Sequence, residues 1–246
     1  MKIDPKAFGD ALTVGYTFKP KTTNAIKVIN EHFKGFDIKT LVKDLERLLK
    51  PYAKEPISRE IEVMDVPPTL RIEYKSENYL DEKEGLYVSR TFRFEKDGLV
   101  VYHEMQQLPD LSRKQGMGKK IMSAFLEQYE KMEVKRIDLY AALSDGGAVW
   151  ARFGFKAIKK SEMERILRQA ERDLAGKDKI LKVVTDTFNS YYEKEPDGNA
   201  FPIQNWVAIP GMEAILKKVD SHWHGRMDLT NSKDLDNFKK YVGEKE

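Results

Sequence analysis

The 246-residue chain contains no cysteine, which excludes disulfides, thiolate zinc sites and cysteine nucleophiles. Nothing in the composition therefore requires an oxidising compartment, and a cytoplasmic location is expected. The chain also lacks a long hydrophobic run: no stretch approaches the roughly 20 apolar residues that span a bilayer. The N-terminus has no apolar run after its basic residue, so neither export nor a membrane partner is expected.

An excess of charge of either sign is missing as well. The 43 Lys and Arg residues nearly balance the 40 Asp and Glu residues and leave a formal net charge of +3. Such a balance gives no electrostatic reason to expect nucleic acid as a partner. What the chain does have is material for a core, with 41% hydrophobic and 11% aromatic residues. The sequence thus indicates a globular protein.

Helical periodicity dominates the first 69 residues. Residues 23–33 and 37–50 each have the apolar spacing of an amphipathic helix, and Pro51 ends the second one. A proline pair at 67 and 68 then interrupts the chain. We therefore expect an N-terminal helical part of the fold over residues 1–69.

From Leu70 onward the hydrophobic period becomes strand-like, and the pattern predicts a core over residues 70–160. Its expected order is three strands, a helix, a strand, a short helix and a further strand. The expected ranges are strands at 70–74, 87–94 and 99–107, a helix after Pro109, a strand at 136–142, a short helix at 148–153 and a strand after Gly154. The stripe of the long helix consists of Ile121, Phe125, Tyr129 and Met132.

The remaining residues, 161–246, are mainly helical in pattern and predict an extension packed on the core. Ser161 and Glu164 have the spacing of a capping box at the start of its first helix, which ends at Gly176. Further helical patterns follow at residues 178–192, 212–219 and 234–242.

An Arg-x-x-Gly-x-Gly motif occupies residues 113–118, between the third predicted strand and the long helix. A helix N-terminus carries unpaired N–H groups and partial positive charge, and glycines let a phosphate approach the backbone. Arg113 and the lysines around it supply further positive charge. Alone, such a turn is more often structural, and a dinucleotide-binding site would need three glycines in a parallel pattern. Its position after a hairpin of long strands favours a different ligand.

These residues resemble the GNAT superfamily of N-acetyltransferases, whose signature Gln/Arg-x-x-Gly-x-Gly/Ala opens a core helix. The later strand, the short helix and the Gly154-Phe155 step also stand where that family has them, so the resemblance covers residues 70–158. It implies an α+β fold with a mixed, mostly antiparallel central sheet flanked by helices, and acetyl-CoA as the cofactor. The phrase from Asp145 to Phe155 is similar to GNAT-like domains of bacterial and phage proteins.

The resemblance also implies cofactor roles for three segments. The backbone of the strand before the signature would pair with pantetheine, the N–H groups of the signature would hold the pyrophosphate, and the thioester would lie beside the end of the next strand. The implied residues are Met105, Gln106, Gln107, Arg113, Gln115, Gly116, Met117, Gly118, Lys119 and Ser144.

Trp150 and Glu104 are the candidate catalytic residues. Trp150 stands where many GNAT enzymes have a tyrosine that protonates the departing thiolate, but an indole N–H has no useful acidity. Trp150 could therefore orient a group, or simply pack in the core. Only one of Glu104 and His103 can face the cleft, since alternate strand residues point to opposite faces, and Glu104 is the preferred general base. A solvated strand carboxylate is the alternative interpretation of Glu104.

Near the C-terminus, His222 and His224 flank Trp223 and, with Asp220, resemble a metal corner. Because no further ligand stands at a recognised spacing, we interpret them as histidines beside a buried tryptophan and expect no metal.

Two functions follow from the resemblance. The first is an acetyl-CoA-dependent N-acetyltransferase, a transferase acting on an amine-bearing small molecule or protein. The alternative is a catalytically inactive GNAT-fold binding or structural module of phage or toxin-type origin, which Trp150 favours.

Overall fold

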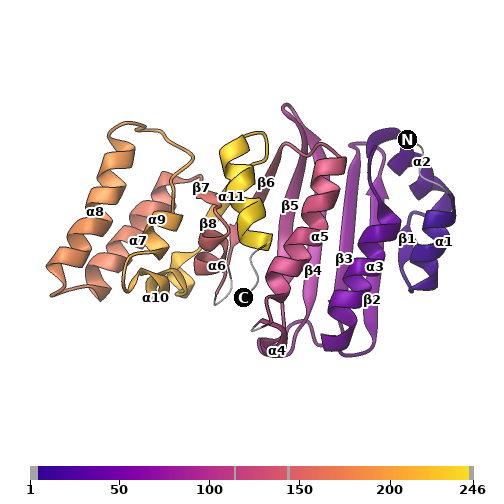
Figure 1. The fold of residues 1–246 in the computed structure, drawn as a ribbon, viewed down its shortest axis with the longest axis horizontal. Helices are drawn as coiled ribbons and strands as arrows, with labels where there is room; N and C mark the ends of the chain where they lie inside the picture. Colours follow the sequence, from indigo (N-terminus) through magenta and orange to yellow (C-terminus); the bar gives the residue numbers. More distant parts are fainter. Residues whose placement is uncertain (1–4, 114, 143–144, 244–246) are drawn as a thin grey trace. The chain divides into compact units, whose positions relative to one another are not determined.

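A computed structural model describes residues 5–113, 115–142 and 145–243 of the chain. The chain divides into two compact units, drawn in Figure 1. The first unit is Met1–Ile137 with Lys239–Glu246, and the second unit is Asp138–Phe238. None of the described helices has both the length and the apolar character needed to cross a membrane.

The first unit contains a mixed, mostly antiparallel arrangement of strands, in the order β1-β2-β3-β4-β5. β1 runs parallel to β2, whereas β2, β3, β4 and β5 pair antiparallel in sequence order. The strands are β1 (Thr17–Lys19), β2 (Ile57–Met64), β3 (Thr69–Ser76), β4 (Tyr87–Glu95) and β5 (Gly98–Gln107). Together with its helices, the unit is of the expected α+β class.

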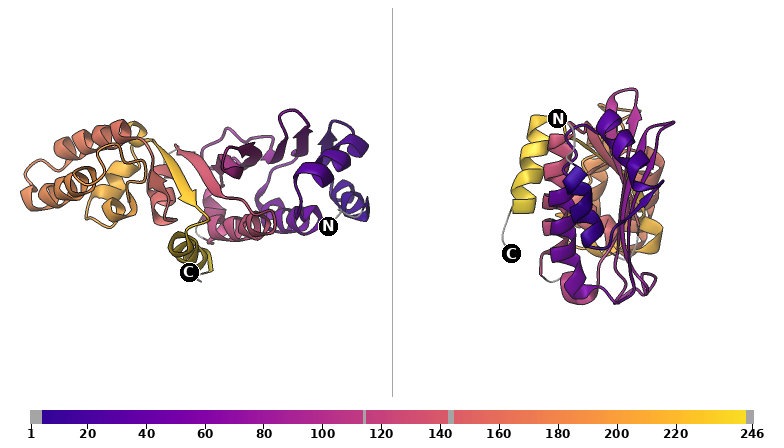
Figure 2. Two further views of the ribbon diagram at one scale, coloured as in Figure 1. Left: turned by 90° about the horizontal axis from the view of Figure 1, so that it is seen from above. Right: turned by 90° about the vertical axis from the view of Figure 1, so that its right-hand side faces the viewer.

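Two helices of the first unit, α3 and α5, lie along one face of this sheet (Figure 2). The helices described for the unit are α1 (Pro5–Thr13), α2 (Thr22–His32), α3 (Ile38–Leu49), the 3-10 helix η1 (Lys50–Tyr52), α4 (Asp110–Arg113) and α5 (Met117–Lys131). α3 begins after Asp37, whose side chain accepts a hydrogen bond from the Thr40 N–H at 3.1 Å, and Pro51 prevents its continuation.

Strand alternation separates a core face from a polar face in the first unit. Leu70, Ile72 and Tyr74 of β3 are buried, while Arg71 and Glu73 point to the opposite face. The helical stripe predicted for α5 is confirmed, since Ile121, Phe125 and Tyr129 are each 0% exposed and Met132 is buried. The Tyr129 ring lies 5.8 Å from that of Phe92 on β4, so this stripe buries apolar surface against the sheet and contributes to the stability of the unit.

The second unit combines three strands, in the order β6-β8-β7, with several helices. β7 and β8 are antiparallel. The elements are β6 (Arg136–Ala141), α6 (Gly146–Arg152), β7 (Lys156–Ala157), α7 (Lys160–Asp173), α8 (Asp178–Tyr192), α9 (Gln204–Val207), α10 (Met212–Leu216), the 3-10 helix η2 (Val219–Ser221), β8 (Trp223–Asp228) and α11 (Ser232–Gly243). The first two residues of β6, and α11 from Lys239 onward, belong to the first unit.

Aromatic side chains form much of the core of the second unit. Trp206 packs its ring 4.8 Å from that of Phe201, and its indole N–H donates to the Val184 carbonyl at 3.2 Å. Trp223 is 0% exposed and donates to the Gly147 carbonyl at 3.3 Å. Both tryptophans are therefore satisfied core residues, as the sequence predicted for Trp223.

The structure divides the chain differently from the three predicted segments. β2 pairs with β3 along eight residues, so segment 1–69 contributes strands to the same sheet as the predicted core. Residues 138–160 instead belong with the C-terminal helices. The sequence analysis also missed β8, and its capping box is wrong. α7 begins at Lys160, Ser161 lies inside the helix, and no side chain among the described residues caps it.

Candidate anion site at the start of α5

The Arg113–Gly118 motif lies between β5 and α5, with the short helix α4 inside it. Gly116 is the N-cap of α5 and has φ 65° and ψ 20°, a left-handed conformation that favours glycine. No side chain of the described residues caps this helix. The N–H groups of Met117, Gly118 and Lys119 lie in its first turn, where no acceptor exists within the helix. This end therefore presents donors and partial positive charge to whatever approaches it.

The second glycine of the motif is next to the end of β5. A Cβ added to Gly118 would lie 3.6 Å from Nε2 of Gln106, an ordinary van der Waals distance. The fold alone therefore does not require glycine at position 118, in contrast to position 116.

The Arg113 guanidinium forms its contacts with groups of the protein itself. Its Nε donates to the Leu108 carbonyl at 2.8 Å, one terminal nitrogen donates to the Glu82 carbonyl at 3.1 Å, and the other lies 3.3 Å from the Asp110 carboxylate. Sequence reasoning assigned this side chain to the cofactor. In the structure it ties the loop before β4 to the turn before α5.

Gln115 also differs from its expected role. Its backbone N–H, predicted to hold a phosphate, donates to the Ser112 carbonyl at 3.1 Å. Its side-chain oxygen accepts a hydrogen bond from the Tyr52 hydroxyl. Lys119 is half-buried and places its ammonium 4.5 Å from the ring centroid of Tyr241.

The end of β5 is irregular. Met105, Gln106 and Gln107 pair with Ser89, Val88 and Tyr87 of β4, and the register shifts between Ser89 and Arg90. Glu104 is the extra residue on β5 at this β-bulge. The three residues expected to meet pantetheine are therefore held by β4 along one edge.

Glu104 and His103 point to opposite faces of β5, as strand alternation requires. The Glu104 carboxylate accepts hydrogen bonds from Ser89 at 3.1 Å and Thr91 at 2.8 Å, lies 3.3 Å from the Arg71 guanidinium, and is 43% exposed. It is thus accessible and fixed in direction. His103 is 4% exposed and hydrogen-bonded to the Tyr129 hydroxyl at 2.8 Å. Burial holds the pKa of His103 well below its usual value.

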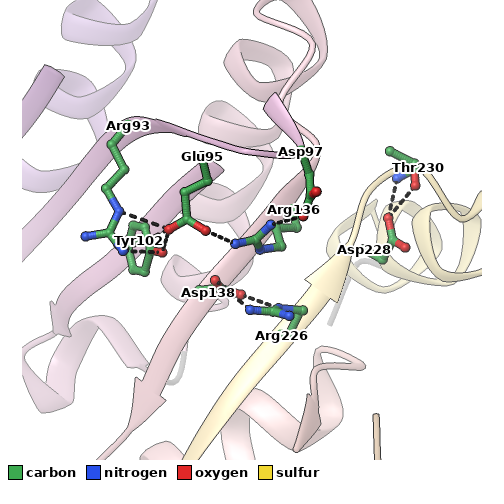
Figure 3. A network of polar contacts seen from close by, with 9 residues as sticks. All are labelled: Arg93, Glu95, Asp97, Tyr102, Arg136, Asp138, Arg226, Asp228 and Thr230. Atoms are coloured by element: carbon green, nitrogen blue, oxygen red, sulfur yellow. Dashed lines mark hydrogen bonds and ion pairs between the residues drawn. The ribbon is translucent and has the colours of Figure 1, made fainter. Parts of the chain in front are cut away.

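A second polar network lies at the other end of the β4–β5 hairpin (Figure 3). Glu95 accepts hydrogen bonds from Tyr102, Arg93 and Arg136, and Arg136 also lies 3.1 Å from Asp97. The hydrogen bond from Tyr102, followed by those from the two arginines, lowers the pKa of Glu95 to about 2. A carboxylate held so firmly in its charged form is a structural group, not a general base.

Arg90 is the residue that sequence reasoning missed. It occupies a core-facing position of β4, between Val88 and Phe92, and is 0% exposed. Burial lowers the pKa of its guanidinium, which still remains charged in a protein. The sequence does contain a signal for this residue: Arg90 stands at a core-facing position of a strand whose other residues alternate regularly.

The other two predicted residues belong to the second unit. Trp150 is 8% exposed, with its ring 5.4 Å from that of Phe153 and 5.3 Å from that of Phe155. This packing agrees with the core interpretation of the indole. Ser144 lies outside the described residues.

His224 is held by Glu162, whose carboxylate lies 2.7 Å from Nδ1 and also accepts from the His224 backbone N–H at 2.7 Å. The Tyr140 ring lies 4.6 Å from the His224 ring and 5.8 Å from that of His222. Within the described ranges, no group of three or more His, Asp or Glu side chains has the geometry of a metal site.

Comparisons with protein-family models, with curated proteins and with solved structures found no match for this chain.

Proposed function

We propose that the chain is an acetyl-CoA-dependent N-acetyltransferase of GNAT type whose cofactor phosphates bind at the start of α5. The observation that carries the proposal is the uncapped first turn of α5, which follows a left-handed glycine and lies beside the end of β5. A helix start whose first-turn N–H groups have no acceptor within the helix, with no Cβ at Gly118, fits a pyrophosphate. The resemblance of residues 113–118 to the GNAT signature supports the same ligand.

Within this proposal the first turn of α5 binds and orients the cofactor. Acetyl-CoA supplies an activated acyl group when bound, and the N–H groups of Met117, Gly118 and Lys119 hold its phosphates. Glu104 accepts the proton that an ammonium must lose before its nitrogen can attack an acyl carbon. Its contacts with Arg71, Ser89 and Thr91 keep the carboxylate in one orientation while part of it stays open to a substrate.

A catalytically inactive binding or structural module is the second candidate. The observation that favours it is Trp150, which packs against Phe153 and Phe155 and has no proton to give a leaving thiolate. In such a module the start of α5 could still bind an anion without turnover.

Titration with acetyl-CoA and with coenzyme A, followed by melting temperature, tests the cofactor assignment. A ligand that binds only the folded state must raise the melting temperature, by an amount that grows with its concentration. A panel of amines with detection of the released thiol then separates the two candidates. Binding with thiol release supports the enzyme, binding without it supports the module, and no binding refutes both cofactor assignments.

For an active enzyme we expect Glu104→Gln to lower turnover by roughly 10²-fold or more, because the amide cannot accept the proton. Trp150→Phe should change turnover by less than about threefold, since no proton transfer depends on the indole. Glu60→Gln, at a position of the same strand parity on β2 and paired with Lys19, is the control and should leave turnover unchanged. A silent Glu104→Gln combined with an inactive, folded Trp150→Phe would reverse these assignments.

A further inference from the structure

Arg90 is a buried charge with an unusual set of partners. In the part of the chain that the structure describes, no carboxylate lies within ion-pairing distance of it, and its Nε has no hydrogen-bond partner. A buried, unpaired charge costs several kcal/mol in general, so the fold must gain something from its presence. The positions of its remaining donors show what that is.

One end of the Arg90 guanidinium donates hydrogen bonds to backbone carbonyls at the β-bulge. A single terminal nitrogen donates to the Ser89 carbonyl at 2.8 Å and to the Met105 carbonyl at 2.7 Å. These two carbonyls lie at the register shift between β4 and β5. Arg90 thereby satisfies acceptors that the irregular pairing leaves, and it fixes the course of β5 after Glu104.

The other terminal nitrogen of the Arg90 guanidinium binds the side chain of Gln106. It donates to the Gln106 side-chain oxygen, Oε1. Since guanidinium has donors and no acceptor, only the oxygen end of the amide can face Arg90. The amide nitrogen, Nε2, must therefore face the other way, and it lies 3.6 Å from the position of a Cβ on Gly118.

We propose that the side-chain amide of Gln106 is a direct ligand of the phosphate bound at the start of α5, and that Arg90 is the residue that positions it. This inference rests on the proposed function and adds a side-chain donor to the backbone donors of the first turn. Gln106 is half-buried. Arg90 also places a permanent positive charge behind the amide, which favours a multiply charged anion over a monoanion.

Gln106→Glu gives the sharpest test, because it changes one atom type and acts in opposite directions on stability and binding. The new carboxylate gives Arg90 an ionic partner, so the melting temperature of the free protein should rise or stay unchanged. The same carboxylate replaces a donor and repels phosphate, so calorimetry should show at least a tenfold loss of affinity for coenzyme A and for inorganic pyrophosphate. If Gln106 were only a partner of Arg90, stability would change while both affinities stayed the same.

Two further variants separate ligand from positioning residue. Gln106→Leu removes the donor without adding charge and should weaken both ligands roughly tenfold in a folded protein. Arg90→Lys keeps the charge but cannot bridge the bulge and Gln106 together, so it should weaken binding less than Gln106→Glu does. Gln169→Glu on α7 is a control for binding alone: its side-chain oxygen also accepts from an arginine, Arg172, but its amide nitrogen donates to Asp173 at 2.8 Å. We expect its affinities to stay within about twofold of wild type.

The outcomes distinguish this inference from the proposed function. Absence of coenzyme A and pyrophosphate binding in the wild type overturns the proposed function and the inference with it. Wild-type binding that survives unchanged in both Gln106 variants overturns the inference alone.

Discussion

The two ends of α5 are built in opposite ways. At the C-terminal end, the Gln128 side-chain oxygen accepts from the Asp37 N–H at 2.8 Å, and the Lys131 ammonium lies 3.0 Å from the Asp37 carboxylate. Gly35 approaches so closely that an added Cβ would lie 2.0 Å from the Lys131 carbonyl oxygen. At the N-terminal end, Gly116 begins the helix without a side-chain cap.

The comparison indicates that the C-terminal end of α5 contributes to stability, whereas the N-terminal end is where we propose that a ligand binds. Tertiary contacts with the segment before α3 satisfy and fix one end. At the other end, the first-turn N–H groups have no acceptor within the helix, which is where we propose that an anion binds. Variants at the C-terminal end should therefore unfold the protein, while variants at the N-terminal end should change binding.

The largest effect on stability is expected from Gly35→Ala, which changes the close contact at the C-terminal end of α5. Gly35 has φ +87°, and its Cβ would meet backbone that cannot move aside. Left-handed strain of about 1–2 kcal/mol and overpacking of about 1–3 kcal/mol should together lower the free energy of unfolding by about 3 kcal/mol or more. Urea denaturation measures this loss.

Gly176→Ala is the control for Gly35→Ala. Gly176 has φ +81° but nothing within 4 Å of an added Cβ, so only the strain of about 1–2 kcal/mol applies. Equal losses in the two variants would show that the close approach of Gly35 to Lys131 contributes nothing.

Arg113→Ala comes next and tests the turn before α5, where the arginine is bound by the protein and its loss should lower stability. Because its guanidinium binds the Leu108 and Glu82 carbonyls, its removal should lower the free energy of unfolding by about 1.5–3 kcal/mol. The midpoint of urea denaturation reports this change, and calorimetry reports coenzyme A affinity in the same protein. An unchanged midpoint with a lost affinity would instead make Arg113 a direct phosphate ligand.

Glu95→Gln should give the smallest effect, about 1 kcal/mol at neutral pH, which is typical of a half-exposed ion pair. Glu95 has a folded-state pKa of about 2, below its ordinary 4.5, so its contribution is present above about pH 4.5 and is lost as the pH falls through about 2. The stabilities of the variant and the wild type should therefore converge over this window. A difference that stayed constant down to pH 2 would exclude the charge as its cause.

Much of the first unit could be predicted because its apolar residues have regular periods. The stripe of α5 and the strands β3, β4 and β5 were found within one or two residues. β2 was missed although Ile57, Ile61 and Val63 alternate, because Arg59 interrupts the pattern at a core-facing position. In the structure Arg59 is compensated by Glu46, 2.8 Å away on α3, a partner that sequence spacing does not show.

The candidate site could be predicted only in part, for the same reason. The glycines before α5 are a local signal, and they were found. The engagement of Arg113 with two distant carbonyls, and the orientation of Gln106 by Arg90, depend on side chains from three strands and loops. Such contacts are set by tertiary packing and leave no periodic trace in the sequence.

The proposal that an anion binds at the N-terminal end of α5 is tested most directly by calorimetric titration of coenzyme A into the wild type, Gly118→Ala and Gly118→Asp. The fold tolerates a Cβ at position 118, and a carboxylate in the first turn of a helix is stabilising by about 0.3–1 kcal/mol. The account predicts that Gly118→Asp melts at or above the wild-type temperature but loses binding by about 10²-fold or more, with Gly118→Ala between the two. Wild-type affinity in a folded Gly118→Asp protein would contradict the assignment of the start of α5 as the anion site.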